Sequence, residues 1–159
     1  MPNLELDKPS IVIRKGERQV DLFDGDEPVK QYKMVLGSSP SGDKEIEGDG
    51  RTPEGEFYVF TRNPKSKFHL SLGLSYPGRE DAERGLKEGL ISREEYDEIV
   101  AAIAEKRMPL QKTKLGGEIY IHGGGTASDW TEGCVALDDD EMTELFEAIP
   151  IGTKVTILP

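Results

Sequence analysis

The chain has 159 residues, the usual size of one domain, so we expect residues 1–159 to fold as a single domain. Apolar residues make up 35% of the sequence and 18 glycines accompany them, a composition that excludes wholesale disorder. The net charge of −11 makes nucleic acids and anionic lipid surfaces unfavourable partners, and no window is long and apolar enough to predict a membrane-spanning helix.

The first third of the chain has the pattern of β-strands. Strand-favouring runs occur at residues 11–13, 18–23 and 29–36, with turn-forming residues between them, and their even spacing predicts an antiparallel meander. Residues 37–55 are rich in glycine, proline, serine and threonine and predict a long surface loop, a type of segment that is often functional. Strand pattern returns at residues 56–61 and 68–72.

The middle of the chain is helical. Ser92 and Glu95 form a capping box and Ile91 and Tyr96 a hydrophobic staple, which together predict a helix over residues 92–106. Residues 79–90 are also compatible with a helix, although two glycines interrupt them. We therefore expect a helical insertion over about 79–109 that packs through its apolar face; the alternative is a lid over the functional site.

The last third returns to mixed pattern. Residues 117–122 predict a strand that a run of three glycines ends. Asp138 and Glu141 form a second capping box that predicts a helix closed by Pro150, and residues 154–158 predict a final strand.

Chemistry is concentrated around one cysteine. Cys134 is the only cysteine, which excludes an intrachain disulfide, and with two histidines the chain is a poor candidate for a zinc site. His122 ends a strand and a glycine-rich loop separates it from Cys134, so the imidazole can activate the thiol as a nucleophile. The N–H groups of Gly133 and Cys134 are candidates for an oxyanion hole. The alternative is that Cys134 is a small buried apolar residue.

Four segments in order carry a family resemblance. They are Gly50–Gly55, Phe68–Pro77, Ile121–Gly123 and Thr131–Val135, the last two being the His-Gly motif and a variant of a Ser-x-Gly-Cys-Ile/Val motif. Through them the sequence resembles the catalytic domain of the YkuD-type L,D-transpeptidases, from about residue 10 to residue 158. The resemblance implies a mainly β fold, a sandwich or open barrel with peripheral helices, that uses no cofactor or metal. It also implies a periplasmic or otherwise extracytoplasmic location, whereas residues 1–9 do not read as an export signal, which leaves a cytoplasmic location open.

The resemblance also implies a mechanism. Cys134 would attack the carbonyl that joins meso-diaminopimelate to D-alanine in a peptidoglycan stem peptide and hold the donor as a thioester. His122 would be the base, and the backbone carbonyl of Gly123 would orient its ring. An amine of a second stem peptide would complete a transpeptidation. The alternatives are an L,D-carboxypeptidase or peptidoglycan hydrolase with the same site, and a non-catalytic wall-binding module.

Substrate contacts are less well defined by the sequence. Thr131 stands at the family's usual serine position, and the further candidates for substrate contact are Gly124, Trp130, His69 and Tyr76. Many relatives have an arginine two residues after the cysteine, where this chain has alanine. By chemistry alone, the candidates to replace it are Arg51, Arg62 and Arg79. The sequence gives no information on oligomeric state.

Overall fold

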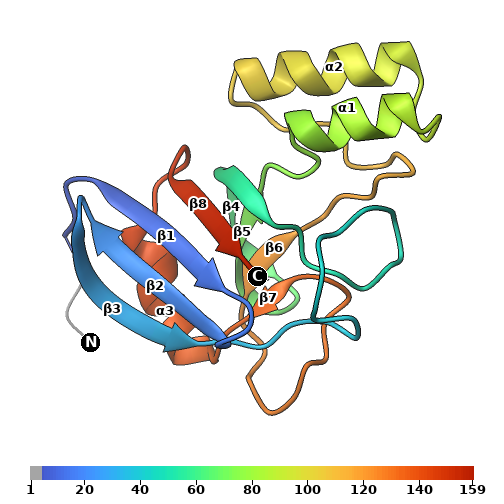
Figure 1. The fold of residues 1–159 in the computed structure, drawn as a ribbon. Helices are drawn as coiled ribbons and strands as arrows, with labels where there is room; N and C mark the ends of the chain where they lie inside the picture. Colours follow the sequence, from blue (N-terminus) through green and yellow to red (C-terminus); the bar gives the residue numbers. More distant parts are fainter. Residues whose placement is uncertain (1–4) are drawn as a thin grey trace.

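The computed structural model describes residues 5–159 and contains one curled sheet of eight strands with three helices (Figure 1). The strand order across the sheet is β3-β2-β1-β8-β4-β5-β6-β7. The strands are β1 (Pro9–Arg14), β2 (Gln19–Asp24), β3 (Glu27–Lys33), β4 (Gly55–Ser66), β5 (His69–Leu74), β6 (Tyr120–His122), β7 (Val135–Ala136) and β8 (Lys154–Leu158). The helices are α1 (Arg79–Lys87), α2 (Arg93–Ala104) and α3 (Asp139–Ala148). The prediction of a mainly β fold with peripheral helices is confirmed, and of the two predicted architectures, sandwich and open barrel, the single curled sheet corresponds to the open barrel.

The predicted N-terminal meander is present. β1 pairs antiparallel with β2, and β2 pairs antiparallel with β3. The final strand β8 pairs in parallel with β1 and antiparallel with β4, so the first and last strands lie side by side in the middle of the sheet. Ile11, Ile13 and Ile157 are buried in the main core, to which α3 contributes Met142 and Leu145.

The two edges of the sheet approach each other. Val35 forms a single bridge with Ala136 and Gly37 forms one with Thr131, so the chain that leaves β3 runs beside β7. β7 has only two residues, too few for a sequence pattern, and was not predicted. β6 is shorter than the predicted 117–122 because Gly116 and Glu118 have φ values of 88° and 56°, which interrupt extended backbone.

The helical insertion forms a small core of its own. α1 and α2 lie side by side at one end of the molecule (Figure 1), and the Ser92–Glu95 capping box is present. α1 forms despite Gly85, and a Cβ at that position would lie 2.9 Å from the Leu115 side chain, so the glycine allows close packing. Ile99 is fully buried, which confirms the predicted packing role of the insertion.

One predicted cap is wrong. Asp138 begins α3 but its carboxylate caps no N–H of the helix; it instead accepts a hydrogen bond from the Thr126 hydroxyl at 3.0 Å. A nearby hydroxyl outside the helix competes successfully for the same oxygen. Within residues 5–159, none of the helices combines the length and apolar character that a membrane crossing requires.

Candidate active site

A cavity of about 850 Å³ lies next to β6 and β7, and most of its lining comes from four loops. Its lining contains both His122 and Cys134. The rest of the lining is Ser38, Lys44, Glu47, Gly48, Gly50, Lys67, Phe68, Gln111, Lys112, Gly116, Gly117, Glu118, Ile119, Trp130, Thr131 and Glu132. No residue of α1 or α2 is among them, so the insertion is not a lid in this structure; it supports the 111–118 wall through Leu115.

Strand register places the two predicted catalytic side chains on one face. In the parallel pair of β6 and β7, Ile121 lies opposite Val135 and His122 opposite Ala136. Cys134 stands two residues before Ala136, and side chains two apart in extended backbone project to the same side. His122 and Cys134 therefore point to the same side of the sheet, into the same cavity.

The ring of His122 is held in one tautomer. Its Nδ1 atom lies 2.6 Å from the carbonyl oxygen of Gly123, and because a carbonyl can only accept, the proton is on Nδ1. Phe68 stacks on the ring with 4.6 Å between centroids, and Trp130 meets it edge-on at 5.5 Å. Burial lowers the pKa of His122, and the Gly123 carbonyl only partly opposes this. The imidazole is thus neutral near pH 7, with a lone pair on Nε2.

Cys134 is half-buried and its thiol is protonated in this geometry. The thiol donates to the carbonyl oxygen of Glu118 at 3.4 Å. Burial raises the pKa of Cys134 to about 11, and the negative charges of Glu118 and Glu132 act in the same direction. The two residues therefore line the cavity as a protonated thiol and a neutral imidazole.

Only one of the two predicted oxyanion donors is available. The Gly133 N–H donates to the Thr131 hydroxyl at 3.2 Å, and that hydroxyl donates to the Cys134 carbonyl at 2.8 Å. Gly133 does not line the cavity, and its role as an oxyanion donor stays a prediction. The Cys134 N–H, by contrast, makes no hydrogen bond to any group of residues 5–159.

The other predicted contact residues divide into two groups. Trp130 lines the cavity, and its indole N–H donates to the Gly125 carbonyl at 3.0 Å. Gly124 lies next to Trp130 outside the lining and donates its N–H to the Asp139 carboxylate at 2.8 Å. Both positions hold the glycine-rich loop in place.

His69 and Tyr76 do not line the cavity. The His69 ring hydrogen-bonds the Thr143 hydroxyl on α3 at 2.7 Å. Tyr76 is 0% exposed and donates its hydroxyl to the Leu115 carbonyl at 2.7 Å, so the predicted substrate contact at Tyr76 is wrong. The His69 side chain is exposed and contacts α3, whereas the Tyr76 ring is buried in the main core.

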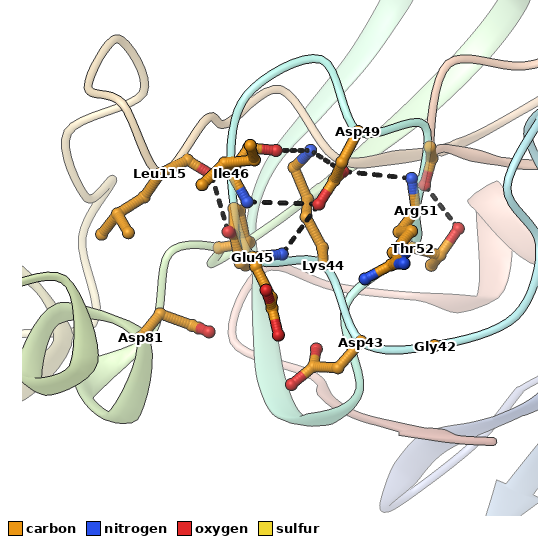
Figure 2. Close-up of polar contacts among 12 residues, drawn as sticks. Gly42, Asp43, Lys44, Glu45, Ile46, Asp49, Arg51, Thr52, Asp81 and Leu115 are labelled. Atoms are coloured by element: carbon orange, nitrogen blue, oxygen red, sulfur yellow. Dashed lines mark hydrogen bonds and ion pairs between the residues drawn. The ribbon is translucent and has the colours of Figure 1, made fainter. Parts of the chain in front are cut away.

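None of the three candidate arginines lines the cavity. Arg62 lies over the Phe146 ring and Arg79 pairs with Glu83 on α1. The cavity has three lysines instead, and Lys44 is already bound to Asp49 at 2.9 Å (Figure 2).

Lys67 and Lys112 are the lysines left for a ligand. They form no ion pair within residues 5–159. Sequence reasoning missed both, and only their position in predicted loops could have suggested them.

Comparison with known structures gives the same fold. Pgp2, the helical cell shape determining protein of Campylobacter jejuni, superimposes with a TM-score of 0.65 at 21% identity over 98% of this chain and 50% of that chain. Bd1075 of Bdellovibrio bacteriovorus gives 0.62 at 20% identity over 96% of this chain and 48% of that one. An L,D-transpeptidase of Mycobacterium smegmatis gives 0.56 at 9% identity over 96% and 59%. The chain spans about half the length of the first two structures.

Comparison of sequences identifies the family. No curated protein sequence matches the chain. The model of the YkuD L,D-transpeptidase catalytic domain matches residues 8–157, which includes every strand and helix described above apart from the last residue of β8. This chain therefore belongs to the YkuD family of L,D-transpeptidase catalytic domains.

Proposed function

We propose that the chain is a cysteine acyltransferase that acts outside the cytoplasmic membrane on peptidoglycan stem peptides. The observation that carries the proposal is the convergence of Cys134 and His122 on one face of β6 and β7, in one cavity. Family membership supports peptidoglycan as the substrate.

The first half-reaction forms a thioester. The Cys134 thiol turns from the Glu118 carbonyl toward the imidazole, and His122 Nε2 takes its proton as the sulfur attacks the carbonyl carbon before D-alanine. The Cys134 N–H stabilises the oxyanion. The C–N bond then breaks, and the leaving amine receives the proton from His122.

The second half-reaction resolves the thioester. An amine of a second stem peptide attacks, His122 accepts its proton, and the thiol leaves, which forms the cross-link. The alternative is that water attacks the same thioester, which would make the enzyme an L,D-carboxypeptidase. This alternative is supported by the size of the cavity, about 850 Å³, which has room for water beside the thioester.

Substrate charge fits the cavity lining. Stem peptides carry free carboxylates, and Lys67 and Lys112 supply cations from two separate loops in a chain whose net charge is −11. They take the place of the arginine that many relatives carry two residues after the cysteine. The lining also contains two carboxylates, Glu47 and Glu132, whose negative charge suits the amine of the acceptor.

The test is incubation with purified disaccharide-tetrapeptide, read by mass spectrometry. Transpeptidation gives a cross-linked dimer with loss of D-alanine, and hydrolysis gives the tripeptide. Cys134→Ala is expected to remove both products while the protein stays folded. Turnover that persists in that variant would rule out Cys134 as the nucleophile. Peptide binding without any product from the intact chain would favour a non-catalytic module.

A further inference from the structure

Buried hydrogen bonds behind Cys134 connect it to the loop over residues 37–54. Thr52 is 0% exposed, and its hydroxyl donates to the carbonyl oxygen of Gly133 at 2.6 Å. Gly133 directly precedes the nucleophile of the proposed reaction. Thr52 itself does not line the cavity, so it has no direct access to a substrate.

The Thr52 contact fixes the orientation of one peptide plane. In a trans peptide the C=O and the N–H point in opposite directions. Because the Gly133 carbonyl points to Thr52, the N–H of the same peptide, which belongs to Cys134, points away from the buried threonine. Cys134 lines the cavity whereas Thr52 does not, and the Cys134 N–H has no partner within residues 5–159.

We propose that Thr52 is a positioning residue that aims the Cys134 N–H at the oxyanion, an inference that rests on the proposed acyl transfer. The hydroxyl acts through the Gly133–Cys134 peptide and touches no reacting atom. A buried donor at this point matters because an oxyanion site stabilises charge only when its N–H is already oriented.

Gly133 has little other freedom. Its φ is 131°, a backbone conformation that residues other than glycine rarely adopt. A Cβ at this position would lie 2.8 Å from the Arg51 carbonyl oxygen. A Cβ at Gly37 would lie 2.8 Å from the Gly133 nitrogen, so the backbone is packed on that side too. The Thr131 hydroxyl holds the preceding peptide and Thr52 holds the following one.

Thr52 is held in turn by buried charge. Lys15, 2% exposed, donates to the Thr52 carbonyl at 2.8 Å and to the Gly42 carbonyl at 2.7 Å. One residue earlier, the Arg51 N–H donates to Asp49 at 3.2 Å (Figure 2). These hydrogen bonds fix the backbone at Thr52 and just before it. The Thr52 hydroxyl therefore holds the Gly133 carbonyl from a fixed position.

The test compares two reactions of the same sulfur in Thr52→Val. Acylation by a carbapenem passes through an oxyanion, whereas alkylation by iodoacetamide does not. We expect acylation to slow by at least about tenfold, since loss of a whole oxyanion donor costs about 100- to 1,000-fold. Alkylation at the same pH is expected to stay within twofold of the unchanged protein, and Thr52→Ser to restore acylation.

Thr153→Val is the matched control. Thr153 is also buried and donates its hydroxyl to a backbone carbonyl, that of Pro150 at 2.7 Å, but it does not line the cavity. It is expected to lower the melting temperature without slowing acylation. Equal acylation rates in Thr52→Val and the unchanged protein, or an equal slowing of acylation and alkylation, would overturn the role of Thr52. If a carbapenem acylates the protein but muropeptides are not turned over, the proposed substrate is wrong. The acylation rates still report the role of Thr52 in that case.

Discussion

The Nδ1 atom of His122 and the carbonyl oxygen of Gly123 are 2.6 Å apart, so the residue that orients the imidazole is its own neighbour in sequence and acts through the main chain. No side-chain substitution can remove this acceptor. The geometry leaves Nε2 as the basic atom, and burial makes the neutral ring its stable form near pH 7.

The acid limb of the pH–rate profile follows from this environment. The lowered pKa of His122 means that its neutral form predominates above about pH 6.5, the ordinary imidazole value. Acylation by a carbapenem is therefore expected to be constant from about pH 6.5 upward over the neutral range and to fall at acid pH, with an apparent pKa below 6.5. Stopped-flow or mass measurements of acylation from pH 4.5 to 8 provide the check. A midpoint above 7 would contradict the assignment of a buried neutral base.

Alkylation of Cys134 reports the thiol instead. Because its pKa is raised to about 11, the iodoacetamide rate is expected to rise about tenfold per pH unit from pH 7 to 10 without a plateau. A plateau near neutral pH would show a resting thiolate paired with His122. The measurement is simple because the chain has one cysteine.

Phe68 covers one face of the His122 ring. Phe68→Ala removes the ring stacked on His122 and lets water reach the imidazole, so the pKa of His122 is expected to rise toward 6.5. The acid limb of acylation then moves to higher pH. Phe23→Ala, at a half-buried ring of β2, is the control and should leave the profile in place. An unchanged midpoint in Phe68→Ala would show that the stacking does not set the pKa.

The sequence predicted those features that local pattern determines. The Ser92–Glu95 capping box, the meander of β1 to β3 and the cysteine and histidine of the site all depend on neighbours in sequence or on short motifs. The helix over 79–87 was harder to predict because its glycine has a packing partner, Leu115, that lies 30 residues away.

What the sequence could not supply is the tertiary contact. Tyr76 sits in a motif segment, yet its direction depends on a carbonyl 39 residues later. The Gly133 N–H was assigned to the oxyanion because spacing cannot reveal that Thr131 occupies it. Lys67 and Lys112 carry no pattern at all and meet only because separate loops wall one cavity.

The two cavity lysines are expected to affect substrate binding more than catalysis. Lys67→Ala and Lys112→Ala each remove one solvent-exposed cation, and such contacts contribute about 0.5–1 kcal/mol, or about a two- to fivefold increase in KM. The effect should shrink at high salt because the charges are screened. Lys65→Ala, an exposed lysine of β4 outside the cavity, is the control. Equal KM values for all three variants would exclude carboxylate recognition by these lysines.

Tyr76 is expected to act on stability alone. Tyr76→Phe leaves the buried Leu115 carbonyl without its donor, and an unsatisfied buried group costs about 1–3 kcal/mol. The free energy of unfolding from urea titration should fall by that amount while KM stays unchanged, because the ring does not reach the cavity. A raised KM with unchanged stability would restore Tyr76 as a substrate contact.

Asp81, at the start of α1, is expected to give the stability of the protein an unusual dependence on pH. Burial raises the pKa of Asp81 to about 6, with the charge of Asp43 adding to it and Arg84 opposing it. Unfolded aspartate titrates near about 3.9, so the folded state binds the proton more tightly. Protonated Asp81 stabilises the folded state, and this stabilisation is fully present below about pH 4 and is lost as the pH rises to about 6. At pH 7 the buried negative charge lowers the free energy of unfolding by about 2–3 kcal/mol.

Asp81→Asn removes that cost and keeps an oxygen that can accept the Gly78 N–H, which now donates to Asp81 at 2.9 Å. The variant is expected to melt at a higher temperature than the unchanged protein at pH 7, with the gap narrowing as pH falls from 6 to 4. Asp97→Asn, at an exposed carboxylate of α2, should show no such trend. Calorimetry across this pH range is the measurement. If the difference in melting temperature between the two proteins does not depend on pH, the ionised Asp81 carboxylate does not destabilise the folded state.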